Sequence, residues 1–176
     1  MRRPEMPAPP TIVIALLLAL SGCGWTPLYA DPQSGPASVE LRAIHVDPIP
    51  DRIGQRLELA LRNSLNPTGE PTNERYRLQT SLRLSLSALG LISAGTSTIG
   101  RVDLTATYRL IDLKDGAVLL TNTVHSQNSF ALNPIEYSTV VGEYDAGARG
   151  VAEINEEIVT RLTLFLQGRV KTTKPS

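Results

Sequence analysis

A chain of 176 residues with 17 basic and 17 acidic side chains has the length of a single domain and carries no net charge. This balance excludes the clearly basic domain that nucleic-acid binding requires, so we expect no nucleic-acid partner. The single cysteine excludes an internal disulfide, and no apolar run approaches the roughly 20 residues of a membrane-spanning helix.

The first 22 residues have the pattern of a bacterial lipoprotein signal peptide. A pair of arginines precedes an apolar run at residues 12–20, which has the length of a signal-peptide core. Leu20-Ser21-Gly22-Cys23 follows directly and resembles a lipobox, in which a branched apolar residue and two small residues precede the cysteine that receives the lipid. We therefore expect residues 1–22 to be removed and Cys23 to anchor the protein through its acyl chains. Gly24, in place of aspartate, favours sorting to the outer membrane by the same resemblance.

The mature chain divides by composition into three parts. Residues 23–37 are rich in Pro, Gly and Ser and predict an extended lipidated tether. Residues 38–170 predict a single α/β sandwich domain, and residues 171–176 a loose polar tail. Without the signal peptide, 15 basic and 16 acidic residues remain, so the mature chain stays near neutrality.

The predicted domain begins with a strand and a helix. Residues 38–47 form a mixed apolar stretch that predicts a strand, which a Pro-rich segment then ends. Asp51 occupies an N-cap position before a helix whose apolar residues recur every four positions as far as Leu65. Asn66-Pro67 ends this helix.

Three strands follow the first helix. Residues 76–88 alternate without a break between apolar even positions and polar odd positions, and residues 102–110 repeat the pattern. Lys114-Asp115-Gly116 predicts a hairpin turn, and residues 117–130 predict the returning strand. The sequence therefore predicts a long antiparallel meander with one apolar face.

A second helix completes the domain. Residues 133–144 are expected to form a loop, with Asp145 capping a helix over residues 146–167. Glu157 and Arg161 lie four positions apart, a spacing that favours an ion pair. The element order β-α-β-β-β-α predicts an α+β fold, in which both helices pack on one face of a four-stranded, mostly antiparallel sheet and leave the other face polar.

Catalysis finds little support in the sequence. Its two histidines, His45 and His125, lie on predicted strands, where a structural or surface role is the common one. The chain has neither a nucleophile elbow nor a zinc-protease motif nor a phosphate-binding loop. We therefore expect no enzyme, no cofactor and no metal site.

Two other features suggest contacts with partners. The polar face of the long hairpin carries five arginines, Arg75, Arg77, Arg83, Arg101 and Arg109, against one aspartate, Asp103. Guanidinium groups bind phosphate and carboxylate, although a solvated sheet face explains the same pattern. The connection Leu89–Gly100 has no charge at all; it is either a loop that inserts into a partner or a partly ordered hairpin end.

Several segments resemble the LptE family of lipopolysaccharide-assembly lipoproteins in its alphaproteobacterial form. The resemblance rests on Cys23-Gly24-Trp25-Thr26-Pro27-Leu28-Tyr29, on Leu61-Arg62-Asn63-Ser64-Leu65, on Tyr76-Arg77-Leu78, on Tyr108-Arg109-Leu110 and on Tyr144-Asp145-Ala146 through Arg149 to Leu162. It spans the mature chain in order, and the opening after the lipobox is its most specific part.

The resemblance implies a function and a set of contact residues. An LptE protein plugs the LptD β-barrel of the outer membrane, helps it fold and binds lipopolysaccharide during export to the cell surface. The implied lipopolysaccharide contacts are Arg77, Arg83, Arg101 and Lys114, and Leu91, Ile92 and Ile99 would enter the barrel lumen. An auxiliary lipoprotein of an ABC-type lipid-transport system is the alternative, and an envelope enzyme comes third.

Overall fold

The structure is a computed structural model that describes residues 36–69, 71, 73–91, 97–132 and 136–173. The predicted signal peptide, residues 1–22, and most of the predicted tether, residues 23–37, lie outside these ranges. In the described part of the chain, no helix combines the length and the apolar character needed to cross a membrane.

The described chain begins with a short helix where the sequence predicts a strand. Helix α2 spans Pro36–Leu41, and strand β1 is limited to Ile44–Val46. Within α2, Leu41 is buried while Val39 is exposed, although a simple alternation places both on one face of a strand. The strand prediction for residues 38–41 is therefore wrong, and only the three residues of β1 pair with the sheet.

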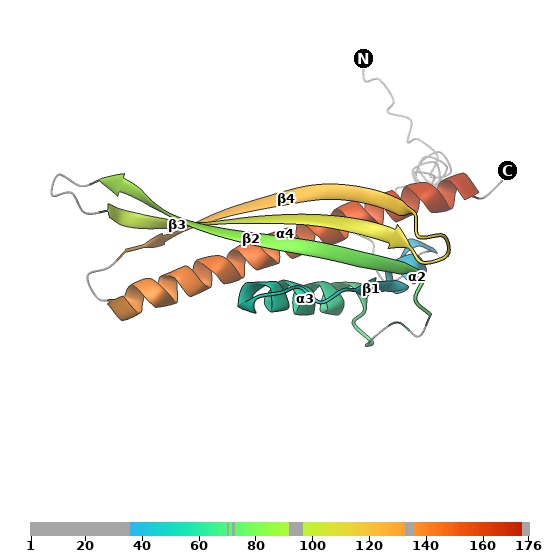
Figure 1. The fold of residues 1–176 in the computed structure, drawn as a ribbon, viewed down its shortest axis with the longest axis horizontal. Coiled ribbons are helices and arrows are strands. Elements are labelled where there is room, and N and C mark those ends of the chain that lie inside the picture. The colour runs from blue at the N-terminus through green and yellow to red at the C-terminus, as the bar shows by residue number, and fades with distance from the viewer. Residues whose placement is uncertain (1–35, 70, 72, 92–96, 133–135, 174–176) are drawn as a thin grey trace, which may run out of the picture. The chain divides into compact units, whose positions relative to one another are not determined.

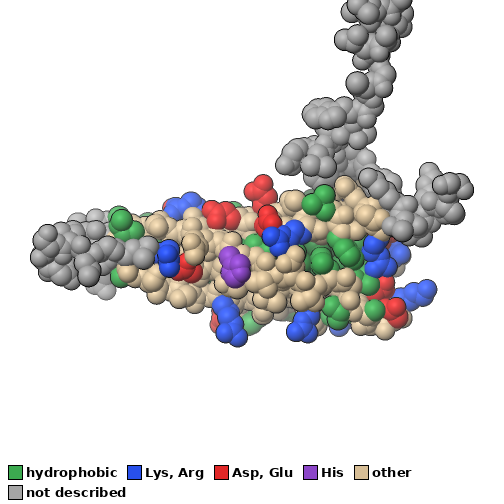
Figure 2. Space-filling model, turned by 90° about the horizontal axis from the view of Figure 1, so that it is seen from above, with side chains coloured by type: hydrophobic (Ala, Val, Ile, Leu, Met, Phe, Trp, Pro, Cys, Tyr) green, Lys and Arg blue, Asp and Glu red, His purple; other side chains and the backbone are tan. Residues whose placement is uncertain are grey.

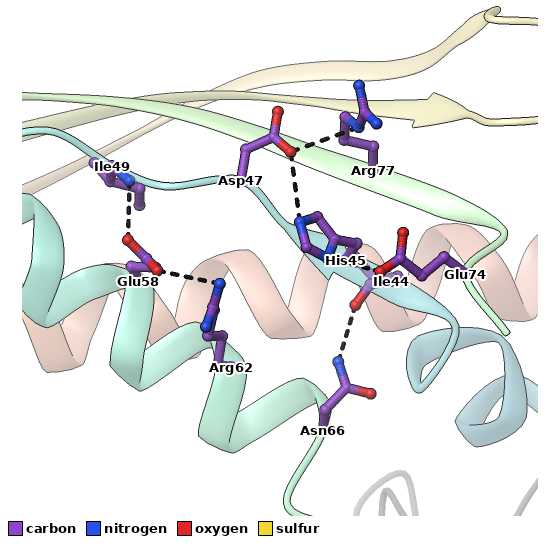
Figure 3. Close-up of polar contacts among 9 residues, drawn as sticks. All are labelled: Ile44, His45, Asp47, Ile49, Glu58, Arg62, Asn66, Glu74 and Arg77. Carbon is purple, nitrogen blue, oxygen red and sulfur yellow. Dashed lines mark hydrogen bonds and ion pairs between the residues drawn. The ribbon is translucent and has the colours of Figure 1, made fainter. Parts of the chain in front are cut away.

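Helix α3 spans Arg52–Leu65, as the periodicity predicts, and buries Leu57, Leu61 and Leu65. Asp51 stands at the N-cap position, as predicted, although its side chain forms no capping hydrogen bond. The chain instead reverses at Asp51, which has a φ of 68°. The buried Ile49 just before it donates its backbone N–H to Glu58 Oε2 on α3 (3.0 Å), as Figure 3 shows.

The sheet has the strand order β1-β2-β3-β4. Strands β2 (Tyr76–Leu91), β3 (Ser97–Asp112) and β4 (Val118–Ala131) form an antiparallel meander, and β1 pairs in parallel with the start of β2. This confirms the predicted four-stranded, mostly antiparallel sheet. The predicted hairpin turn between β3 and β4 contains Gly116 at a φ of 73°, which glycine adopts without strain.

Helix α4 is far longer than predicted, because it spans Glu136–Thr173 where the sequence predicts residues 146–167. Most of the predicted loop over residues 133–144 is therefore helical. Asp145, the predicted N-cap, lies inside the helix and forms an ion pair with Arg149 one turn later. The helix also continues into the predicted C-terminal tail.

The two long helices cover one face of the sheet, as Figure 1 shows. The core contains Tyr76 and Leu78 at the start of β2, the even-numbered residues of β3 from Val102 to Leu110, and the apolar stripes of both helices. Its largest fully buried side chains are Ile44, Ile49, Leu57, Leu61, Leu78, Leu104, Tyr108, Leu110, Ile154, Ile158, Leu162 and Leu166. The predicted arrangement of helices on one face and a polar opposite face is confirmed.

Helix α4 approaches β4 closely through a glycine and a polar cluster. A Cβ atom at Gly150 would lie 2.8 Å from Leu104 Cδ1 and 3.0 Å from Ser126 Oγ, so a larger residue would require these side chains to move. Ser126 Oγ donates to Glu153 Oε2 (2.5 Å), and Asn128 Nδ2 donates to the same carboxylate (3.1 Å). Arg149 Nε donates in turn to Asn128 Oδ1 (3.3 Å). Since Ser126 and Asn128 are buried, these bonds fix the position of α4 along β4.

Tyr108 provides a test of how burial affects stability at high pH. Its hydroxyl is buried and has no hydrogen-bond partner among the described residues. Burial raises the pKa of this phenol above its ordinary value of 10.0, and the nearby positive charge of Arg161 opposes the rise. Ionisation therefore favours the unfolded chain as the pH rises above about 10, and the folded state loses stability there.

We expect Tyr108→Phe to be at least as stable as the natural chain at pH 7, because the substitution removes an unpaired buried hydroxyl. We also expect its stability to fall less between pH 9 and pH 11. Urea unfolding followed by circular dichroism at several pH values measures both effects. The same loss of stability in both proteins would contradict the assignment to Tyr108 and would favour Tyr76, whose burial also raises its pKa.

Candidate interaction surface

The face of the sheet opposite the helices, here called the open face, is polar along its length. Figure 2 looks onto this face, where neutral side chains and backbone cover much of the surface and charged, histidine and hydrophobic side chains lie among them. No described element packs on it. The residues of the open face are Arg77, Gln79, Ser81, Arg83, Ser85, Ser87, Arg101, Asp103, Thr105, Thr107, Arg109, Thr121, Thr123, His125, Gln127 and Ser129.

The arginines of the open face differ in how they are neutralised. Arg77 lies 3.5 Å from Asp47, and Arg101 lies 2.9 Å from Asp103. Arg83 and Arg109 form no ion pair with any described residue, so their charges are available to a ligand. Arg83 therefore fits a role in anion binding better than Arg77 and Arg101 do.

Arg75 does not belong to this set, although the sequence predicts it there. Its guanidinium reaches Glu40 on α2 at 2.5 Å. The hydroxyl of Tyr76, a core residue, donates to the same carboxylate at 2.8 Å. Arg75 is thus part of the contact between α2 and the start of β2.

Arg101 and Lys114 do not lie together. Arg101 is near the start of β3, and Lys114 lies in the turn after the end of that strand. At about 3.4 Å per residue, their backbones are on the order of 40 Å apart. A single phosphate group cannot contact both residues.

The uncharged connection from Leu89 to Gly100 is largely strand. Strands β2 and β3 pair as far as Leu91 and Ser97, in continuous register with the rest of the hairpin. Of the residues predicted to enter a partner, Leu91 lies in β2, Ile92 lies outside the described residues, and Ile99 is a half-exposed residue of β3.

The two histidines have polar neighbours of different kinds. In Figure 3, His45 Nδ1 lies 2.9 Å from Glu74, and Asp47 stands between His45 (3.9 Å) and Arg77 (3.5 Å). His125 Nδ1 lies 3.0 Å from the Thr105 hydroxyl on the open face. Within the described ranges, no cluster of histidine, cysteine and carboxylate side chains is arranged to hold a metal ion.

Sequence reasoning missed an exposed apolar patch at the far end of β2. Leu84 and Leu86 belong to the helix-facing side of the strand, yet 43% and 49% of their surfaces are exposed. The cause is a difference in length: β2 has 16 residues and α3 has 14, but a strand rises about twice as far per residue. Figure 1 shows β2 continuing well beyond the first turn of α3. The predicted lengths of this strand and this helix differ in the same way, so a comparison of the two could have revealed the exposed patch.

Known proteins resemble the chain in sequence and in fold. The family model described as LptE, lipopolysaccharide-assembly, matches residues 41–162. A search of curated proteins finds no match.

Solved structures of three bacterial lipoproteins share the fold. A lipoprotein from Caulobacter crescentus superposes with a TM-score of 0.62 at 19% identity, covering 75% of this chain and 96% of its own. A minor lipoprotein from Acinetobacter baumannii gives a TM-score of 0.56 at 16% identity, covering 69% and 90%. Lipoprotein B from Nitrosomonas europaea gives 0.55 at 13% identity, covering 76% and 89%. At these identities, the likeness establishes the fold alone.

Proposed function

Because the chain belongs to the LptE family of lipopolysaccharide-assembly proteins, we propose that it is an outer-membrane lipoprotein that plugs and helps assemble an LptD-type β-barrel and binds lipopolysaccharide during its export. The match over residues 41–162 carries this proposal, since it includes all four strands and most of both long helices. The family is not enzymatic, and we propose that this chain too acts by binding.

The proposed anchor is the lipid on Cys23. The lipobox-like sequence before it supports this assignment, and the structural neighbours are themselves described as lipoproteins. Helix α2 begins at Pro36, so residues 24–35 separate the lipid from the first described element. The protein would then lie on the periplasmic side of the outer membrane or within the barrel lumen.

The open face is the surface that we propose for the barrel and the lipopolysaccharide. Its neutral hydroxyl and amide side chains suit the polar inner wall of a barrel. Arg83, with support from Arg77 and Arg101, would contact lipid phosphates, and Lys114 would act separately at the other end of β3. Leu91 and Ile99, toward the far end of the hairpin, would insert into the lumen together with Ile92.

Co-purification tests the proposed partner. Tagged full-length protein is extracted from membranes in mild detergent, captured, and its companions are identified and quantified by mass spectrometry. We expect an outer-membrane β-barrel in an amount equal to the bait. An ATPase or permease in its place would overturn the plug assignment and would favour the lipid-transport alternative.

Replacement of Arg77, Arg83 and Arg101 by serine is expected to weaken binding to purified lipopolysaccharide by about twofold to fivefold per contributing arginine. Arg83→Ser alone should account for the largest share, because Arg83 has no ion-pair partner among the described residues. The loss should shrink at high salt, since exposed charges are screened. Titration at low and high salt, with Arg62→Ser on α3 as the control, measures this. Equal affinities at both salts would contradict the role of the open face.

A further inference from the structure

The edges of a sheet carry backbone groups that require partners, and side chains of this chain bond three such carbonyl oxygens. At β1, Asn66 Nδ2 donates to the carbonyl oxygen of Ile44 (2.9 Å; Figure 3). At β4, two arginines of α4 have the same role: Arg149 donates to the carbonyl oxygen of Ser129 (3.1 Å), and Arg161 donates to that of Thr123 (3.4 Å).

The outer edge of β2 has no such cover. Strand β1 pairs only with Tyr76, Arg77 and Leu78, and the last backbone bond runs from Asp47 N–H to Leu78 O (3.0 Å). The chain then continues through Pro48 and Pro50, which have no N–H group to donate. Beyond this point, no described residue bonds the outward backbone groups of β2.

The residues that form this edge follow from the strand alternation. Tyr76 N–H and Leu78 O both point toward β1, and the pairing of β2 with β3 stays in register along the strand. The even-numbered residues therefore present their N–H and C=O groups outward. We call this segment the bare edge of β2; it consists of Thr80, Leu82, Leu84, Leu86 and Ala88.

The bare edge adjoins the exposed apolar patch. Leu84 and Leu86 lie on the helix-facing side of the same residues, and a pocket there is lined by Leu84, Ile53 and Tyr144. A strand added along β2 would cover both leucines, since every second side chain would face the same way. Backbone pairing and apolar burial would then occur together.

The charges beside the bare edge are mainly positive. Arg83 projects from β2 onto the open face, and Arg52 and Arg56 lie over the Tyr144 ring on the helix side, 5.6 and 3.9 Å from its centre. In the described structure, none of these arginines forms an ion pair with an acidic side chain, although Glu143 lines the same pocket. A second copy of the chain would bring like charges together, whereas an acidic segment would complement them.

We propose that the bare edge of β2 binds an extended acidic segment of a partner protein, which adds to the sheet as a fifth strand. Alternating N–H and C=O groups along an edge match the backbone of a strand, and a lipid cannot pair with them in this way. The bound segment would place apolar side chains over Leu84 and Leu86 and carboxylates on the open face beside Arg83. This inference does not depend on the identity of the barrel partner.

Amide hydrogen exchange on the full mature protein in detergent tests the edge directly. In the free protein, the amides of Leu84 and Leu86 should exchange fast, while those of Arg83 and Ser85, which face β3, should be protected. The probe is a capped octapeptide of alternating valine and aspartate at millimolar concentration. We expect it to protect Leu84 and Leu86 selectively, and a valine–lysine peptide to protect neither.

A charge reversal provides the matched test. Arg83→Glu should weaken binding of the aspartate peptide by about threefold or more and allow the lysine peptide to bind. Arg109→Glu, on the same face but on the central strand β3, should change neither. Leu86→Pro removes one outward N–H at an edge position and should reduce peptide binding further. If this variant does not fold, Arg83→Glu still tests the proposal.

Three results would overturn the proposal. Protection of Leu84 and Leu86 in the free protein would mean that another segment of this chain or a second copy already occupies the edge. Absence of peptide protection at millimolar concentration would exclude strand addition. Protection by anionic phospholipid vesicles but not by the peptide would assign the patch to a lipid surface.

Discussion

Replacement of Cys23 by alanine is expected to move the protein from the membrane fraction to the soluble periplasmic fraction. Each buried CH₂ of an acyl chain contributes about 0.8 kcal/mol, and a single chain holds a protein only marginally, so the loss of all chains removes the anchor. The domain should still fold, since Cys23 lies outside the described fold. The variant should be exported behind a signal peptide that is cleaved without lipidation, because an uncleaved signal peptide would itself hold the chain on the membrane.

Fractionation of cells that lack the barrel partner measures this effect, and mass spectrometry of the N-terminal peptide identifies the acyl chains. The natural chain with its own signal peptide is the control and should remain in the membrane fraction. Recovery of the processed alanine variant entirely in the membrane fraction would contradict lipidation at Cys23.

Leu162→Ala is expected to lower the free energy of unfolding by about 2–5 kcal/mol. Leu162 is 0% exposed and belongs to the stripe of α4 that packs in the core. Removal of its side-chain carbons leaves a cavity that its neighbours fill only in part. Because domains of this size are stable by about 5–15 kcal/mol, this single change should remove a large part of the total.

Leu164→Ala is the matched control, because it makes the same chemical change two residues later in the same helix. Leu164 is 53% exposed, so its replacement should cost about 0.5 kcal/mol or less. Urea titration of both variants at one pH gives the comparison. Equal losses would mean that α4 does not pack on the sheet in the orientation described.

The periodic elements could be predicted from the sequence because each buries one face. The leucines of α3 and the alternation of β2 and β3 follow directly from that burial, and the Glu157–Arg161 pair is present at 2.6 Å. The turn at Gly116 could be predicted because its geometry selects glycine.

The start of α4 could not be predicted in this way. Val140, Val141 and Gly142 have low helix propensity, and both valines are exposed, so no local signal favours a helix there. A helix that already packs on the sheet can extend through such residues, since each added residue needs no new nucleus. Asp145 was predicted to be the N-cap because the apolar stripe of the helix begins after it. In the structure it lies inside α4 and forms an ion pair with Arg149.

The arrangement of charges on the open face was predicted in outline only. Alternation placed Arg77, Arg83, Arg101 and Arg109 on one face, but it could not show that acids neutralise Arg77 and Arg101. Asp47 directly follows β1, whereas Arg77 lies in β2, so the ion pair between them depends on the register of β1 against β2. The apolar patch at Leu84 likewise depends on where α3 begins beneath β2.

The pairing of β1 has a consequence for the order in which the chain folds. Strands β2, β3 and β4 join neighbours through short connections, whereas β1 reaches β2 only after the whole of α3 and gains three paired residues in return. Closing that long loop costs conformational entropy for few contacts, so we expect the hairpins to form early and β1 to dock late. Strand β1, the strand nearest in sequence to the proposed lipid, should thus be the last to join the sheet.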